Sequence, residues 1–254
     1  MPAMTPDEPK RLLLVPGLGT DARLFAHLRP PPGWTIVTLP FLLHRRGESL
    51  RGYARRMADL ARRLRPDAIG GSSFGGMIAQ EMAHALGMPE VIVIDSVRSG
   101  GEVPPARFRF FSVMTRSAPT WLLRRLGDLL FDGMMRGNRV DERLWPEAKA
   151  MLAEAPWDFT RWSVPAILSW PGLPPDSGVR IRDIHGEHDE MFPLKHRRTP
   201  PERVVRGAGH MLPYSAPEAV SEFLAEVLGE AVAPEAAVAG VGEAVGGGFE
   251  PPRG

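Results

Sequence analysis

The sequence has 254 residues, of which 43% are hydrophobic, and its 31 basic and 30 acidic side chains leave a formal net charge of +1. A chain of this length buries roughly 70% or more of its unfolded surface, so it needs neither disulfides nor metal ions to hold a core together. The balanced charge gives no general attraction to nucleic acid or anionic membranes, and the absence of cysteine excludes thiol catalysis and disulfides.

The first predicted strand is a continuous apolar run over residues 11–15, after a polar, proline-rich lead-in over residues 1–10. Such a short run is typical of a strand buried on both faces of a parallel sheet. Residues 17–22 then follow the spacing Gly-x-Gly-x-x-Ala, which also occurs in dinucleotide-binding loops. That site requires an acidic residue after the second strand, and the strand predicted over residues 34–39 ends without one. We therefore interpret the turn as a glycine-rich loop that offers a backbone N–H to an oxyanion.

The next segments alternate between helices and strands. A helix is predicted over residues 47–64, whose clustered arginines are interpreted as a solvated surface. A third strand over residues 68–72 leads through a glycine-rich turn into a helix over residues 75–86, and a fourth strand covers residues 91–94. This alternation indicates right-handed crossovers and a parallel sheet.

The turn after the third strand contains the pattern Gly71-x-Ser73-x-Gly75, which matches a nucleophile elbow. In such a turn the apical serine has a strained backbone, and side chains two positions away on either side would collide with the neighbouring helix and strand. The pattern alone does not decide the function, because Gly-Ser turns before helices also bind phosphate or simply connect elements.

The alternation stops between residues 98 and 178, where no buried strand is evident and helices are predicted over residues 119–135 and 141–153. We interpret this section as a helical insertion whose aromatic residues mostly form its own core. An insertion placed over Ser73 would also supply an apolar pocket. The aromatic residues of the section are Phe108, Phe110, Phe111, Trp121, Phe131, Trp145, Trp157, Phe159, Trp162 and Trp170.

The sheet resumes with strands predicted over residues 180–184 and 203–205, and a closing helix is predicted over residues 217–228. The last section, residues 230–254, is dominated by Ala, Gly, Val, Pro and Glu. We therefore expect it to be flexible, as we do the lead-in.

Three polar residues each follow a predicted strand, and they occur in the order Ser73, Asp189, His210. Ligands bind at this edge of a doubly wound sheet, and the order nucleophile, acid, histidine is that of the α/β-hydrolase arrangement. The sequence resembles the α/β-hydrolase superfamily over about residues 11–97 and 179–228. The motifs that carry the resemblance are Leu13-Leu14-Val15-Pro16-Gly17-Leu18-Gly19, Gly71-Ser72-Ser73-Phe74-Gly75-Gly76, His185-Gly186-Glu187-His188-Asp189 and Gly207-Ala208-Gly209-His210.

The resemblance implies an α/β fold with a doubly wound, mostly parallel sheet and a helical lid over residues 98–178. It also implies roles for single residues. Ser73 would attack a carbonyl carbon and form an acyl-enzyme, His210 would accept the serine proton and later activate water, and Asp189 would orient the imidazole. The backbone N–H groups of Leu18 and Phe74 would form the oxyanion hole. Many relatives have histidine where this chain has Pro16, but the donor itself lies at Leu18.

Other assignments of the polar residues are open at this stage. Asp95 also ends a strand and is an alternative acid, whereas Asp183 is expected to point into a helix interface or into solvent. His185, His188 and Asp189 together could bind a metal, although ligands rarely gather in one tight turn without a fourth group elsewhere. We expect instead that His185 packs in the interior and that His188 lies at the rim, with no metal and no cofactor.

These observations favour a carboxylesterase-like serine hydrolase that acts on an ester, thioester or related acyl bond of a small, partly apolar substrate. The fold also hosts lyases, acyltransferases and cofactor-free haloperoxidases, and a slow-turnover ligand-binding sensor is a further alternative. No apolar run approaches the length of a membrane span, and the lead-in lacks the apolar core of a signal peptide. We therefore expect a cytoplasmic protein without a nucleic-acid partner. The natural substrate and the oligomeric state are not readable from the sequence.

Overall fold

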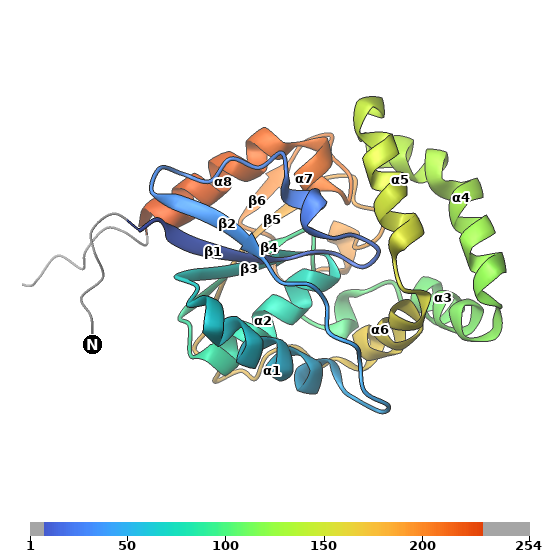
Figure 1. The fold of residues 1–254 in the computed structure, drawn as a ribbon, viewed down its shortest axis with the longest axis horizontal. Coiled ribbons are helices and arrows are strands. Elements are labelled where there is room, and N and C mark those ends of the chain that lie inside the picture. The colour runs from blue at the N-terminus through green and yellow to red at the C-terminus, as the bar shows by residue number, and fades with distance from the viewer. Residues whose placement is uncertain (1–7, 231–254) are drawn as a thin grey trace, which may run out of the picture.

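A single parallel sheet forms the centre of the molecule in the computed structural model, which describes residues 8–230 (Figure 1). Its six strands lie in the order β2-β1-β3-β4-β5-β6, and every neighbouring pair is parallel. This arrangement confirms the predicted fold class. The strands are β1 (Lys10–Val15), β2 (Trp34–Thr38), β3 (Ala68–Ser72), β4 (Glu90–Ile94), β5 (Arg180–Gly186) and β6 (Arg203–Val205).

The sequence of β1 explains why the sheet is buried on both faces. Leu12, Leu13, Leu14 and Val15 have no exposed surface, and successive side chains point to opposite faces of a strand. Leu13 and Val15 accordingly belong to one hydrophobic cluster, and Leu12 and Leu14 belong to the other. A continuous apolar run is therefore what a strand covered on both faces requires.

Helices cover the two faces of the sheet (Figure 1). On one face lie α1 (Leu50–Ala61) and α2 (Phe74–Leu86), and on the other lies α8 (Pro217–Glu230). The helix predicted over residues 47–64 begins later than expected, because Ser49 is its N-cap and its hydroxyl accepts a hydrogen bond from the Gly52 N–H. A short 3-10 turn then covers the last three residues of the predicted range.

Between β4 and β5 the chain forms four further α-helices at one side of the molecule (Figure 1). These are α3 (Pro105–Ser117), α4 (Thr120–Gly137), α5 (Trp145–Glu154) and α6 (Trp157–Ser169). The helices predicted over residues 119–135 and 141–153 correspond to α4 and α5, whereas α3 and α6 were not delimited from the sequence. Pro165 lies inside α6, where proline normally indicates the end of a helix. Pro105 lies in the first turn of α3, where proline is common because its missing N–H would have no intrahelical acceptor.

The aromatic residues of this helical section do not form a separate core, which corrects the expectation from the sequence. Phe159 and Trp170 belong to the same buried cluster as α1 and α2. Phe131 belongs to the cluster on the other face of the sheet. Phe110 and Trp121 are 72% and 66% exposed. The section is therefore packed onto the sheet domain on both sides rather than around a centre of its own.

Two residues at the edges of the segments predicted to be flexible lie in regular secondary structure. Residues 1–7 and 231–254 lie outside the described residues, but Lys10 begins β1 and Glu230 ends α8. Across residues 8–230, no helix combines the length and apolar character that crossing a bilayer demands.

Candidate active site

Ser73 occupies a strained turn between β3 and α2. Its φ of 53° and ψ of −122° fall outside the regions that non-glycine residues normally adopt. The Ser73 N–H donates to the Ile94 carbonyl at 2.9 Å, and the Ser96 hydroxyl donates to the Ser73 carbonyl at 2.6 Å. The next strand, β4, and the turn after it therefore hold the strained residue in place.

The glycines around Ser73 leave no room for a side chain. A Cβ atom on Gly71 would lie 2.4 Å from the Gly75 carbonyl oxygen, and one on Gly75 would lie 2.1 Å from the Val15 carbonyl oxygen. These contacts are with backbone atoms, which cannot rotate away. The sharp turn therefore depends on glycine at both positions.

The three residues singled out from the sequence meet at the carboxyl ends of β3, β5 and β6. The Ser73 hydroxyl oxygen lies 2.8 Å from Nε2 of His210, and Nδ1 of His210 lies 2.8 Å from Oδ2 of Asp189. Both contacts are hydrogen bonds, so the three side chains form a continuous chain from a hydroxyl to a carboxylate. The imidazole of His210 is 14% exposed, whereas the Asp189 side chain is fully buried.

Asp189 is held in its ionised form by its neighbours. Burial alone would raise the pKa of this carboxyl, but the charge of His210 and hydrogen bonds from His185 and His210 outweigh it. The pKa of Asp189 therefore lies well below its usual range. Its second oxygen, Oδ1, accepts the Phe192 N–H at 2.8 Å.

Asp95, the alternative acid, lies close to this group without contacting His210. Its two carboxylate oxygens accept the N–H groups of Gly186 at 2.9 Å and Leu212 at 2.7 Å. Burial and the nearby charge of Asp189 raise the pKa of Asp95 well above its usual value, against these two hydrogen bonds. Asp95 thus ties together the loops that carry Asp189 and His210.

One of the remaining predictions was wrong, and another was incomplete. Asp183 faces neither a helix interface nor solvent, because its buried carboxylate forms ion pairs with Arg98 at 3.2 Å and with Arg197. His185 is buried as expected, but it also contacts Asp189, which the sequence reasoning missed. The HG-x-x-D spacing of the turn was the available signal, since a histidine four residues before the acid can fold back onto it. The His188 side chain is 52% exposed.

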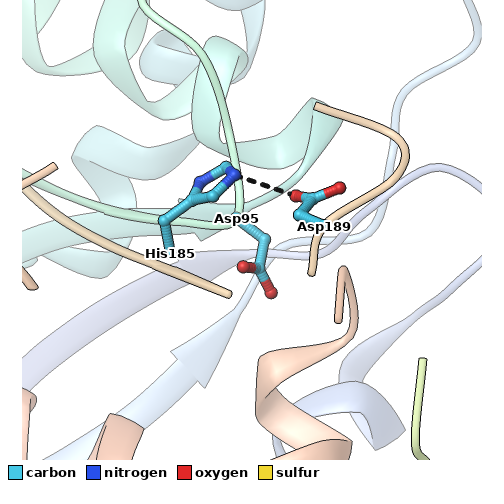
Figure 2. Close-up of side chains that lie close together, drawn as sticks. All are labelled: Asp95, His185 and Asp189. Carbon is cyan, nitrogen blue, oxygen red and sulfur yellow. Dashed lines mark ion pairs between the residues drawn. The ribbon is translucent and has the colours of Figure 1, made fainter. Parts of the chain in front are cut away.

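One cluster of side chains has the composition of a possible metal site. It consists of Asp95, His185 and Asp189 (Figure 2). One ligand atom from each lies within 4.8 Å of the others. However, Nε2 of His185 lies 2.9 Å from the Phe192 carbonyl oxygen and therefore carries a hydrogen, and Asp95 already accepts two backbone N–H groups. A cation would have to displace these bonds, so the donor set fits hydrogen bonding better than metal binding.

The loop after β1 lies against Ser73. A Cβ atom on Gly17 would lie 3.3 Å from Cβ of Ser73, so the next residue, Leu18, belongs to a loop that lies against Ser73. Thr20 closes this loop by donating to the Gly17 carbonyl from both its N–H and its hydroxyl. The N–H of Phe74 lies in the first turn of α2, where N–H groups lack intrahelical acceptors.

A cavity of about 510 Å³ adjoins the same loop. Leu18 and Thr20 line one side, and Phe41, Met151 and Phe159 line another. The helical section between β4 and β5 contributes the last two residues. A slightly larger cavity of about 590 Å³ is lined by exposed charged residues such as Arg29 and Arg143. Neither cavity is lined by Ser73, Asp189 or His210, but the smaller one is lined by Leu18 of the loop that lies against Ser73.

Comparison with known families identifies the family of the chain. Residues 12–223 match the model of the alpha/beta hydrolase family. The chain belongs to the alpha/beta hydrolase family. No curated protein sequence gives a significant match.

Solved structures share the fold of this alpha/beta hydrolase at low identity. A thermophilic esterase from Thermogutta terrifontis is 18% identical with a TM-score of 0.61, over 87% of this chain and 90% of the esterase. An enol-lactonase from Burkholderia xenovorans is 16% identical with a TM-score of 0.67, over 87% and 92% of the two chains. An N-acyl homoserine lactonase is 18% identical with a TM-score of 0.62, over 91% and 92%.

Proposed function

We propose that this alpha/beta hydrolase is a carboxylesterase-like serine hydrolase that cleaves an ester, thioester or related acyl bond through an acyl-enzyme. The observation that carries the proposal is the hydrogen-bonded chain from Ser73 through His210 to Asp189, built on a strained turn. A hydroxyl bonded to an imidazole, whose other nitrogen is bonded to an ionised carboxylate, is the arrangement that activates a serine.

In the proposed reaction, the Ser73 oxygen attacks the carbonyl carbon of the substrate while its proton passes to Nε2 of His210. Asp189 stabilises the charged imidazolium, and the N–H groups of Leu18 and Phe74 donate to the oxyanion of the tetrahedral intermediate. His210 then gives the proton to the leaving alcohol or thiol as that bond breaks. In the second half, His210 takes a proton from water, the resulting hydroxide attacks the acyl-enzyme, and the proton returns to Ser73 as the acid is released.

The cavity beside Leu18 supports a small, partly apolar substrate. Phe41, Met151 and Phe159 offer apolar surface, and the last two come from the helices that we propose as a lid over residues 98–178. The solved relatives include an esterase and two lactonases, which all open an acyl–oxygen bond and support the same class of reaction here. A cytoplasmic location remains a prediction.

The first test is covalent labelling with a fluorophosphonate probe, followed by hydrolysis of p-nitrophenyl esters from acetate upward. We expect the wild type to be labelled and the Ser73→Ala variant to remain unlabelled. Ser73→Ala and His210→Ala should each lower kcat by about 10³–10⁶-fold, with Asp189→Asn somewhat milder. Rates should change with acyl chain length because apolar side chains such as Phe41, Met151 and Phe159 line part of the cavity.

Two outcomes would contradict the proposal. A wild type that the probe does not label would exclude an activated Ser73. A wild type that is labelled but releases no product would favour the slow-turnover sensor. If Asp189→Asn were fully active and Asp95→Asn inactive, Asp95 would be the acid.

A further inference from the structure

His185 is a fully buried histidine that the proposed reaction does not use. It lies next to the end of β5 and has no exposed surface. Its Nε2 atom lies 3.1 Å from Oδ2 of Asp189 (Figure 2). The same oxygen also contacts His210. Two imidazoles therefore share one carboxylate oxygen.

The surroundings of His185 determine which nitrogen carries its proton. Nε2 lies 2.9 Å from the Phe192 carbonyl oxygen, to which it hydrogen-bonds, and 3.1 Å from Oδ2 of Asp189. Its single hydrogen therefore faces two acceptors, and Nε2 is the donor. Nδ1 lies 3.5 Å from Nη1 of Arg197, and a guanidinium can only donate, so Nδ1 keeps its lone pair. His185 therefore donates from Nε2 and presents its acceptor nitrogen, Nδ1, to Arg197.

Arg197 is anchored independently of the site. Its side chain is 1% exposed, and it donates to the Ser96 carbonyl and to the carboxylate of Asp183. Its Nε atom lies 3.6 Å from a carboxylate oxygen of Glu102, which is also buried. The scaffold thus fixes a hydrogen-bond donor beside Nδ1 of His185, so that this nitrogen faces the guanidinium with its lone pair.

We propose that His185 is a positioning residue, which holds the Asp189 carboxylate so that Oδ2 faces His210, and that Arg197 keeps His185 in the tautomer that can do this. The kinetic consequence rests on the proposed function, because the orientation of Asp189 affects turnover only if His210 accepts the Ser73 proton.

The buried carboxylate needs this donor because water cannot replace it. Asp189 is 3% exposed, and its other donors are the Phe192 N–H and His210. Without the His185 N–H, one donor is lost at Oδ2, and the carboxylate is free to turn about its Cβ–Cγ bond. The imidazole of His210 then loses alignment with Ser73, whereas substrate binding, which does not involve Asp189, is unaffected.

Two variants of similar side-chain length separate hydrogen bonding from packing. His185→Gln keeps an N–H donor close to the position of Nε2, whereas His185→Met has no donor. His188→Met is a matched control, because His188 lies in the same turn with a half-exposed side chain. Each protein is measured for kcat and KM on a p-nitrophenyl ester, for melting temperature, and for the low-field proton resonance of the His210 Nδ1–H.

For His185→Met we expect kcat to fall by about 10–100-fold and KM to change by less than about twofold. His185→Gln should recover kcat to within about threefold of the wild type, and His188→Met should match the wild type. The low-field resonance should shift in His185→Met and persist in His185→Gln.

The proposal is overturned if His185→Met retains wild-type kcat, or if Gln and Met lower kcat and melting temperature equally, since packing alone would then explain the effect. If the wild type itself hydrolyses no ester, the proposed function fails separately. The proton resonance of His210 then tests the role of His185. An identical signal in the wild type, His185→Met and His185→Gln would exclude a hydrogen bond from His185 that orients Asp189.

Discussion

At the residue scale, the site contains two buried aspartates whose surroundings shift their pKa values in opposite directions. Asp189 contacts two imidazoles and stays ionised, whereas burial and the nearby charge of Asp189 raise the pKa of Asp95. The difference follows from the partners, because both carboxylates lose solvation and both accept backbone N–H groups.

These shifts predict opposite effects of pH on stability. The pKa of Asp189 is lower in the folded state than in the unfolded state, where it is about 4. The ionised carboxylate therefore stabilises the fold above about pH 4, and this contribution is lost as pH falls through the pKa of the folded state. The pKa of Asp95 is higher in the folded state than in the unfolded state. Its protonated carboxyl therefore contributes stability that is fully present below about pH 4 and is lost as pH rises through the pKa of the folded state.

The measurement is the free energy of unfolding of the wild type minus that of Asp95→Asn or Asp189→Asn, from urea titrations at a series of pH values. For Asp95→Asn, this difference should decrease as pH rises above about 4, because the wild type loses stability when Asp95 ionises. For Asp189→Asn, the difference should decrease as pH falls below about 4, because the wild type loses stability when Asp189 is protonated. Differences that do not vary with pH would show that neither carboxyl is perturbed.

At the element scale, the turn between β3 and α2 depends on the close approach of three backbone segments. Gly75 lies against the end of β1, and Gly71 lies against Gly75. The glycines of the motif are therefore needed so that β1, β3 and α2 can pack closely together, and not only because the turn favours glycine.

We predict that Gly75→Ala destabilises the protein by about 3 kcal/mol or more, because its Cβ would overlap backbone atoms of Val15 and Pro16. Gly133→Ala in α4 is the control, since a Cβ there would meet no atom within 4 Å. It should stabilise the protein by about 0.5–1 kcal/mol through helix propensity. Chemical denaturation of both variants checks this, and a Gly75→Ala variant as stable as the wild type would contradict the turn geometry.

At the scale of the whole molecule, the helices between β4 and β5 are firmly packed at some places and open at others. Phe159 on α6 is buried and lies against Phe41, Tyr53 and Phe74. By contrast, Leu129 on α4 is 76% exposed. If this section acts as a lid, α6 is its attached part and α4 its outer part.

Phe159→Ala should therefore cost about 3–5 kcal/mol of unfolding free energy, whereas Leu129→Ala should stay within about 0.5 kcal/mol of the wild type. Phe159 also lines the cavity beside Leu18, so Phe159→Ala should shift the preferred p-nitrophenyl ester toward longer acyl chains. Thermal unfolding and the ester series measure both effects. An unchanged chain-length preference in a folded Phe159→Ala protein would place the acyl group elsewhere.

The sequence by itself determined the sheet, because runs such as Leu12–Val15 and Val91–Ile94 are local signals of strands buried on both faces. It also placed Ser73, Asp189 and His210 at strand ends, since the carboxyl ends of parallel strands lie at one edge. Only the tertiary structure decided which groups surround them. Asp95 bonds to Leu212, and Arg197 bonds to Ser96, between segments far apart in the chain. Such contacts depend on packing that no local pattern encodes, whereas the contact of His185 with Asp189 spans only four residues.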